Sequence, residues 1–215
     1  IQGEVTPYDN TKKVQASIVG IVKDESGAVI ANAQVTTGTY STQTDAQGFF
    51  AFTNVSVPEH ATTIKVRKTG YFNGSRAIAI QAGSRHEARI VLMAKGTPEL
   101  FVSSNGGTVN FAGGLSITFP ANGIKNAATG QAYSGPVYVY AKKIDPSTTV
   151  GRESMPGDLR GLTAANGEER LLQSFGMMVA ELYDANGNAG IINIIYKKNI
   201  IYLLKYSSNA YLSIV

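Results

Sequence analysis

The chain carries two histidines, and they are the first residues to consider for acid–base chemistry. His60 follows Pro58-Glu59 and His86 follows Ser84-Arg85, so both are expected in exposed turns or loops. No serine occupies the G-x-S-x-G pattern that marks the nucleophile of many hydrolases. The sequence has no cysteine, which excludes thiol nucleophiles, disulfides and zinc–thiolate sites. These residues therefore predict no nucleophilic catalysis.

A second candidate for chemistry is the polar stretch 145–170, which is rich in glycine and proline and holds the carboxylates Glu153, Asp158, Glu168 and Glu169. Two carboxylates that converge in a cleft could act as the acid and base of a glycosidase. A solvated loop is the simpler interpretation, and we favour it. The sequence thus predicts that the chain is not an enzyme and holds no catalytic residue, cofactor or metal.

A calcium loop is the third possibility, since Asp184, Asn186 and Asn188 offer oxygen ligands at alternate positions. The glycine of this stretch stands at the fourth place rather than the sixth, and no bidentate glutamate follows. The Asn-Gly step at 186–187 instead favours a hairpin turn of type I′. We therefore expect a turn here and no bound metal.

Tyrosines give the fourth candidate site. Tyr138 and Tyr140 alternate with valines in the predicted strand Val137–Ala141, and Tyr133 lies close by in the sequence. Exposed aromatic rows can stack on sugar rings, although the same pattern also suits the second packed face of a sandwich. Tyr133, Tyr138 and Tyr140 are the predicted ligand-binding residues.

Charge and hydropathy limit the classes of partner that can be expected. The 215 residues include 19 Lys and Arg against 15 Asp and Glu, and no segment gathers them into a basic stripe. Nucleic acid is therefore not an expected partner. No run of about 18 apolar residues occurs, so no membrane span is expected. The chain begins at Ile1 rather than Met, which suggests export by a removed signal peptide and leaves room for a lipid anchor upstream.

The elements that would hold these residues are short strands. Turn signals recur every 8–12 residues from Lys13 to Lys95, and helix signals are poor, with Glu168–Gln173 as the best stretch. A step in the hydrophobic pattern predicts a bulge near Gly20, and Phe49 and Tyr71 are expected core residues. The predicted strands in this part are 14–22, 29–37, 49–55, 64–67, 77–80 and 88–93.

These turn and core residues form a recognisable set. The set comprises Gly20-Ile21-Val22 with Asp24, Gly27 and Ile30, then Ala33 and Val35, Thr44-Asp45 with Gly48 and Phe49, and Lys68-Thr69-Gly70-Tyr71. Residues 14–94 thereby resemble the carboxypeptidase regulatory-like domain, a transthyretin-like sandwich common on exported proteins of Bacteroidetes. The resemblance implies a structural domain without the metal ligands or nucleophile of the enzyme that gives the family its name.

The remainder resembles the sandwich domains that follow regulatory-like domains in bacterial surface proteins. The elements that carry this resemblance are Phe119-Pro120-Ala121-Asn122-Gly123, Val137-Tyr138-Val139, Met155-Pro156-Gly157-Asp158, Phe175-Gly176-Met177 and Glu181-Leu182-Tyr183-Asp184. The last residues, 191–215, are dominated by Ile, Asn, Lys and Tyr and do not match the preceding pattern.

We therefore predict an all-β chain of two consecutive β-sandwich domains, the first a transthyretin-like Greek key of about seven strands. The expected parts are a leader at 1–12, the regulatory-like sandwich at 13–95, a second sandwich at 96–190 and an atypical tail at 191–215. The expected function is a non-catalytic module at the cell surface or in the periplasm, acting in adhesion, scaffolding or ligand presentation towards a cell-surface protein or a glycan. The alternative is a glycan-binding accessory module of a polysaccharide-utilisation or peptidase system.

Overall fold

The structure is a computed structural model that describes residues 11–126, 129–157, 160–162, 169–171, 176–187 and 190–192. Strands dominate the described residues, so the predicted all-β class is confirmed. The chain divides into two compact units. The first unit comprises Ile1–Ala94 with Pro146–Phe175, and the second comprises Lys95–Asp145 with Gly176–Val215.

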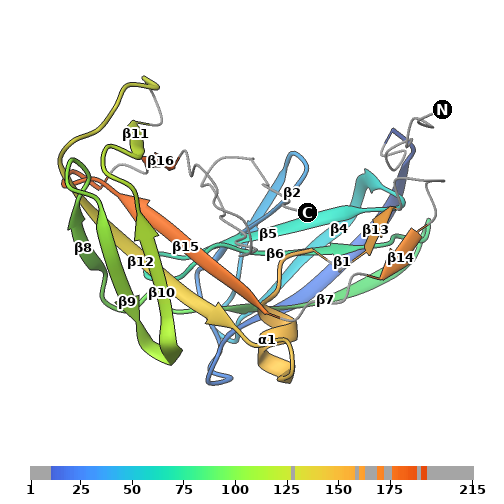
Figure 1. Ribbon diagram of the computed structural model, residues 1–215. Coiled ribbons are helices and arrows are strands. Elements are labelled where there is room, and N and C mark those ends of the chain that lie inside the picture. Colours follow the sequence, from blue (N-terminus) through green and yellow to red (C-terminus); the bar gives the residue numbers. More distant parts are fainter. Residues whose placement is uncertain are drawn as a thin grey trace. The chain divides into compact units, whose positions relative to one another are not determined.

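Residues 13–92 of the first unit form a sandwich of seven strands in two sheets (Figure 1). One sheet has the order β4-β1-β7 and the other has the order β3-β2-β5-β6. The inward side chains of both sheets share one apolar core, and the expected seven-stranded sandwich is thereby confirmed. The strands are β1 (Lys13–Asp24), β2 (Gln34–Thr37), β3 (Tyr40–Gln43), β4 (Phe49–Pro58), β5 (Thr62–Arg67), β6 (Gly74–Ile78) and β7 (Arg85–Leu92).

The irregularity in the first sheet lies elsewhere than predicted. The inward set of β1 keeps even numbers from Ala16 to Val22, so no bulge occurs at Gly20. Instead, Thr53 and Asn54 of β4 together oppose Ser17, and Asn54 adopts a left-handed φ of 49°. The extra residue changes the phase of β4, whose inward residues are even-numbered before it and odd-numbered after it.

This phase decides which of two neighbouring phenylalanines enters the core. Phe50 is 4% exposed, whereas Phe49 is 55% exposed on the opposite face, so the prediction of Phe49 as a core residue is wrong. Gly20 makes room for the Phe50 ring, because a Cβ at position 20 would lie 2.4 Å from Phe50 Cζ. The Phe50 ring can therefore occupy this place in the core only because residue 20 has no side chain.

Aspartates build the two turns that flank the Phe49 end of this sheet. One carboxylate oxygen of Asp24 accepts the Ser26 hydroxyl and the Ser26 and Ala28 amides. The hydroxyl bond first, and then the amides, hold the pKa of Asp24 below its ordinary value. Asp45 likewise accepts the amides of residues 47 and 49. Gly48 closes this second turn at φ 78°, and a Cβ there would approach Val22 O to 2.8 Å.

The lysine of the Lys68-Thr69-Gly70-Tyr71 motif joins two loops. Its Nζ donates to the carbonyl oxygens of Ala31 (2.9 Å) and Asn32 (3.4 Å), in the connection between β1 and β2. Tyr71 packs against the core as predicted. Val29 forms only an isolated bridge with Lys23, so residues 29–30 do not form the strand that was expected there. Conversely, the strand β3 was not predicted from the sequence.

The segment 145–170 contains a short helix, in a stretch whose sequence carries no helix signal. Helix α1 spans Thr149–Ser154, and the Thr148 hydroxyl caps it by accepting the Gly151 amide at 2.9 Å. The prediction of a helical turn at 168–173 is wrong for the part that is described, since Glu169–Leu171 is the strand β14, paired with β13 (Arg160–Leu162). Among the described residues, no helix is long and apolar enough to cross a membrane.

The second unit packs a three-stranded sheet against a hairpin. The sheet has the order β15-β12-β8, and β9 pairs with β10 across the 3-10 turn Ala112–Gly114. Phe101 and Phe119 stack between the two layers with ring centroids 4.5 Å apart. The strands are β8 (Glu99–Val102), β9 (Gly107–Phe111), β10 (Leu115–Phe119), β11 (Ile124–Asn126), β12 (Pro136–Ile144), β15 (Met177–Tyr183) and β16 (Gly190–Ile192).

The turn after β15 differs from the predicted type I′ hairpin. Gly187 has φ 79°, but Asn186 does not have the positive φ that a type I′ turn requires. The Asp184 carboxylate accepts the Asn186 amide, and the Asp184 carbonyl accepts the Gly187 amide, so the aspartate shapes the turn. β15 pairs with β12 and β16 pairs with β11, so this turn joins strands of different sheets.

Candidate binding face

One face of the β15-β12-β8 sheet carries a continuous group of aromatic and aliphatic side chains. In β12, Val137, Val139 and Ala141 point into the core, which leaves Tyr138 and Tyr140 on the opposite side. The register extends this side to both neighbouring strands. We call the group the tyrosine face, and it consists of Leu100, Val102, Tyr138, Tyr140 and Tyr183.

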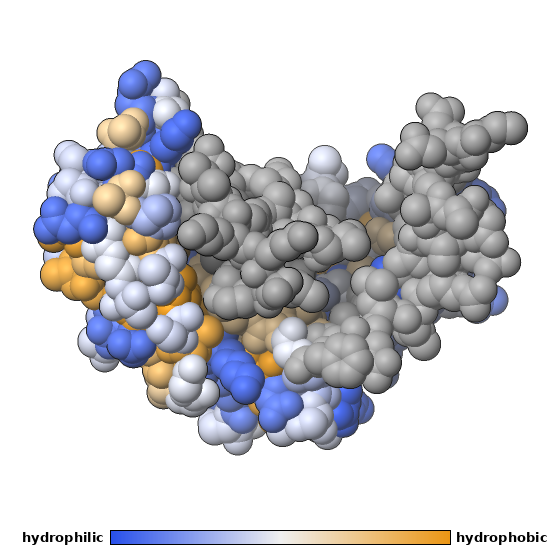
Figure 2. All heavy atoms as spheres, in the orientation of Figure 1, coloured by the Kyte–Doolittle hydropathy of each residue, from blue (hydrophilic) through white to orange (hydrophobic). Residues whose placement is uncertain are grey.

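The register places three of these residues in a row across the sheet. Tyr138 stands opposite Leu100 on β8 and opposite Tyr183 on β15. Leu100 is 55% exposed and Val102 is 42% exposed, whereas Tyr138 and Tyr140 are half-buried. Hydrophobic residues, in orange, reach the surface of the part that holds β8 to β12, on the left of Figure 2. Exposed aliphatic groups beside tyrosines are typical of contact surfaces.

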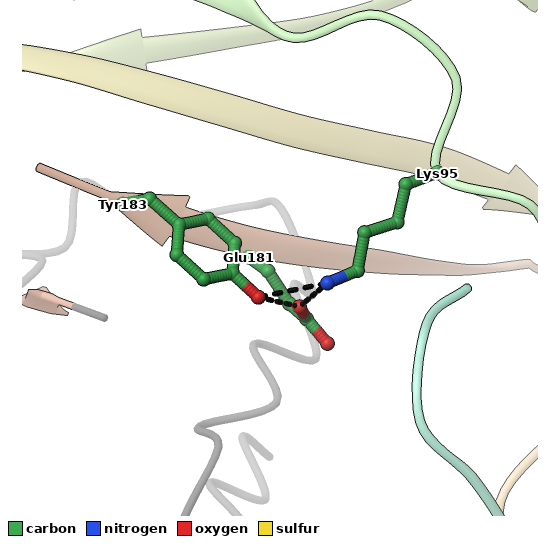
Figure 3. A network of polar contacts seen from close by, with 3 residues as sticks. All are labelled: Lys95, Glu181 and Tyr183. Atoms are coloured by element: carbon green, nitrogen blue, oxygen red, sulfur yellow. Dashed lines mark hydrogen bonds and ion pairs between the residues drawn. The ribbon is translucent and has the colours of Figure 1, made fainter. Parts of the chain in front are cut away.

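A polar trio borders the tyrosine face (Figure 3). The Lys95 ammonium lies 2.7 Å from a carboxylate oxygen of Glu181 and donates to the Tyr183 hydroxyl at 2.8 Å. The Tyr183 hydroxyl in turn donates to the same Glu181 oxygen at 2.5 Å. The Glu181 side chain is only 6% exposed, so the trio satisfies a carboxylate that would otherwise be costly to bury.

The trio also fixes the orientation of two rings. Tyr140 and Tyr183 meet edge to face, with ring centroids 5.7 Å apart and an angle of 86° between their planes. The Lys95 ammonium lies 4.9 Å from the Tyr183 centroid and 5.7 Å from the Tyr140 centroid, within cation–π range. These two rings therefore do not form a flat platform, and the accessible apolar part of the face lies towards Leu100 and Tyr138.

The same contacts change two pKa values. Burial alone would lower the pKa of Lys95, but the hydrogen bonds to Glu181 and Tyr183 and the attraction of the Glu181 charge outweigh it, so the pKa is raised. Burial raises the pKa of Tyr183, and its hydrogen bond to Glu181 raises it further, against the opposing effect of Lys95. Both groups thus keep their protons more firmly than they would in an unfolded chain.

This arrangement predicts a loss of stability at high pH. Because both folded pKa values lie above the ordinary values of 10.5 for Lys95 and 10.0 for Tyr183, their contribution is complete below about pH 10 and declines as the pH rises through the folded values. Urea unfolding of the wild type and of Lys95→Met, measured between pH 8 and 11, should show a steeper alkaline decline in the wild type. Identical declines in both proteins would contradict the prediction.

The structure joins two of the three predicted tyrosines. Tyr138 and Tyr140 share the tyrosine face, while Tyr133 packs against the core of the second unit and its hydroxyl donates to the Pro136 carbonyl at 3.0 Å. Sequence reasoning missed Tyr183, Leu100 and the trio. The alternation of Glu181 and Tyr183 with the inward Ala180 and Leu182 was the available signal, but their partners depend on the register between strands.

The other candidates for chemistry lie apart from this face. His60 is an exposed loop residue as predicted, but His86 lies within β7 rather than in a turn, where its Nε2 accepts the Gln81 amide at 3.0 Å. Glu153 lies in α1, while Asp158 and Glu168 fall outside the described residues and the side chain of Glu169 is likewise not described. Within the described part of the chain, no three His, Asp or Glu side chains gather as metal ligands.

Comparison with known proteins finds a family match for the first sandwich. Residues 17–93 match the family model of the carboxypeptidase regulatory-like domain. This match covers most of β1 to β7, and it agrees with the motif residues and the two-sheet architecture described above. No curated protein matches the chain.

Three solved structures from Bacteroides and Parabacteroides species show weak similarity. A candidate membrane-associated protein of unknown function from Bacteroides fragilis is 18% identical with a TM-score of 0.31, over 46% of this chain and 35% of that chain. A candidate carbohydrate-binding protein from Bacteroides uniformis is 9% identical with a TM-score of 0.30, over 81% of each chain. A DUF3823 family protein from Parabacteroides merdae is 12% identical with a TM-score of 0.28, over 82% of this chain and 95% of that chain. The chain thus spans about a third of the first protein, and similarity at this level establishes no shared function.

Proposed function

Since residues 17–93 are a carboxypeptidase regulatory-like domain, we propose that the chain is a non-catalytic module of an exported bacterial protein that binds a partner at the cell surface or in the periplasm. The tyrosine face of the second unit is the proposed contact surface. The role is adhesion, scaffolding or ligand presentation, with a cell-surface protein as the first candidate partner.

The exposure of Leu100 beside Tyr138 carries this proposal. A leucine that is 55% exposed and a valine that is 42% exposed, on one face with half-buried tyrosines, make a contiguous apolar surface with hydroxyl groups at its border. Protein contact surfaces are enriched in tyrosine, which combines a large apolar ring with a polar end. The Lys95–Glu181 pair holds the bordering Tyr140 and Tyr183 rings in one geometry, which lowers the entropy lost on binding.

A glycan is the second candidate, favoured by Tyr138 itself. Its ring lies on a strand and has no ring partner among the described residues, unlike the rings of Tyr140 and Tyr183. A single accessible ring with a hydroxyl can stack on one sugar and donate to the next. The apolar neighbours Leu100 and Val102 add no hydrogen-bonding groups for a sugar, which is why the protein partner stands first.

Photocrosslinking from the face tests the proposal. A benzophenone amino acid replaces Leu100 in the full chain, exported in a Bacteroidetes host, and crosslinked products are identified by mass spectrometry. The matched control carries the same photocrosslinker at Val29, which is 47% exposed in the first unit. In parallel, a glycan array compares the wild type with Tyr138→Ala/Tyr140→Ala.

The outcomes separate the two partners. A defined protein crosslinked from position 100 but not from position 29 supports the first candidate. Glycan binding that is lost in the folded double variant supports the second. Failure of both experiments, or equal crosslinking from positions 100 and 29, overturns the tyrosine face as the contact surface.

A further inference from the structure

The first unit has a groove that the proposed function does not use. It lies on the outward face of the β4-β1-β7 sheet, has a volume of about 830 Å³, and is bounded by Thr42 and Gln43 of β3 and by Glu153 of α1. The three strands that carry it lie side by side in Figure 1. All of its described lining residues belong to the first unit, so the groove is a property of that unit alone.

The floor of the groove is apolar. The register sets Val19 of β1 opposite Ala51, and Ile21 opposite Phe49, all on the face turned away from the core. Val19 and Ile21 are half-buried, and Phe49 is more than half exposed at 55%. An outward strip of this kind, central in its sheet, is unusual for a face that only contacts water.

One wall of the groove is a line of alternating charges. Arg85, Glu87 and Arg89 are exposed and project from the same face of β7. The parallel register places Glu87 beside Val19 and Arg89 beside Ile21, so the charged line borders the apolar floor directly. Among the described residues, none of these three side chains forms an ion pair or a side-chain hydrogen bond.

We propose that this groove binds an extended polypeptide segment in which acidic, basic and acidic residues occupy every second position. Side chains two apart in an extended chain are separated by about 6.5–7 Å, which is also the spacing along β7. A segment lying along the groove can therefore meet Arg85, Glu87 and Arg89 in turn while its intervening apolar side chains contact Val19 and Ile21. The charge order, rather than net charge, specifies the occupant.

Other charges in the groove fit this assignment. Lys23 and Glu153 also line it, with one charge of each sign, so the groove does not favour a uniform polyanion. The Asp45 carboxylate also lines the groove, but it accepts two backbone amides in its own turn. It is therefore less available to a bound segment than the three side chains of β7. A compact ligand would reach only part of the charged line, since Arg85 and Arg89 are about 13 Å apart along the strand.

Two immobilised peptides of identical composition and net charge test the inference. One carries the order Glu-Val-Lys-Val-Glu and the other the order Lys-Val-Glu-Val-Glu, both with blocked ends. Along Arg85, Glu87 and Arg89 the first peptide can form three ion pairs, whereas the second brings like charges together at two of the three positions. The full chain should prefer the first by about tenfold at low salt, and the preference should shrink as salt rises. The variant Arg85→Glu/Glu87→Lys/Arg89→Glu should prefer the second peptide by a similar factor.

The control is Arg67→Glu, an exposed arginine of β5 in the other sheet, which should leave the preference unchanged. An inverted preference in the triple variant also shows that this variant is folded. Absence of binding by either peptide at millimolar concentration, or a preference that survives the charge reversal, overturns the proposal.

Discussion

Replacing Phe50 with alanine is expected to lower the free energy of unfolding by about 3–5 kcal/mol, the range found for large aromatic side chains in protein cores. Phe50 is 4% exposed and lies edge to face with Phe52 at a centroid distance of 6.0 Å. Alanine leaves a cavity beneath Gly20, which has no side chain to fill it. Guanidinium unfolding followed by tyrosine fluorescence suits this measurement, because the chain contains no tryptophan.

The neighbouring Phe49→Ala is the matched control. It removes the same number of atoms one residue away, but from a side chain that is 55% exposed on the outward face. The expected loss is about 0.5 kcal/mol or less, as for other surface substitutions. Equal losses for the two variants would show that the register of β4 is not the one described.

Replacing Lys95 with methionine is the second large effect, with an expected loss of about 2–3 kcal/mol. The change leaves the Glu181 carboxylate, 6% exposed, without its cation and with the Tyr183 hydroxyl as its remaining partner in the trio. Breaking a fully buried pair costs about 3–5 kcal/mol, and the 18% exposure of Lys95 reduces that figure here. Urea unfolding at pH 7 measures the change.

The double variant Lys95→Met/Glu181→Met separates the orphaned charge from the loss of the pair. Removing both charges should restore most of the stability, since an apolar pair of similar size often replaces a buried ion pair without loss. A Lys95→Met loss below about 0.5 kcal/mol would place the pair among ordinary surface ion pairs and would remove the argument that it orients the tyrosines.

Strands with one-sided alternation are the part of this fold that the sequence predicts well. Val137–Ala141 alternates valine with tyrosine, and Met177–Tyr183 is apolar between turn signals; both are strands as expected. The aspartate turns at 24 and 45 were also predictable, because the side chain and the following glycine act within five residues.

Features that depend on pairing between distant residues were not predictable. The phase of β4 changes at Thr53–Asn54 only because these residues face Ser17 of β1, so the sequence Phe49-Phe50 does not reveal which ring is buried. α1 begins at a threonine cap in a stretch without apolar periodicity, which leaves little for pattern analysis to detect.

The candidate face was half predictable for the same reason. Tyr138 and Tyr140 follow from the alternation of one strand, and any reading of that strand finds them. Leu100 and Tyr183 join them only through the order β15-β12-β8 and its register. Lys95 reaches Glu181 across 86 positions of sequence, a contact that no local pattern encodes.

The parallel pairing of β1 with β7 has a mechanical consequence. Eight consecutive pairs, from Ser17 with Arg85 to Asp24 with Leu92, join the first and last strands of the sandwich side by side. A pull on the start of β1 and the end of β7 acts along the strands in opposite directions, so it shears these hydrogen bonds together instead of opening them one at a time. A domain connected in this way is expected to resist stretching between these two ends of the sandwich.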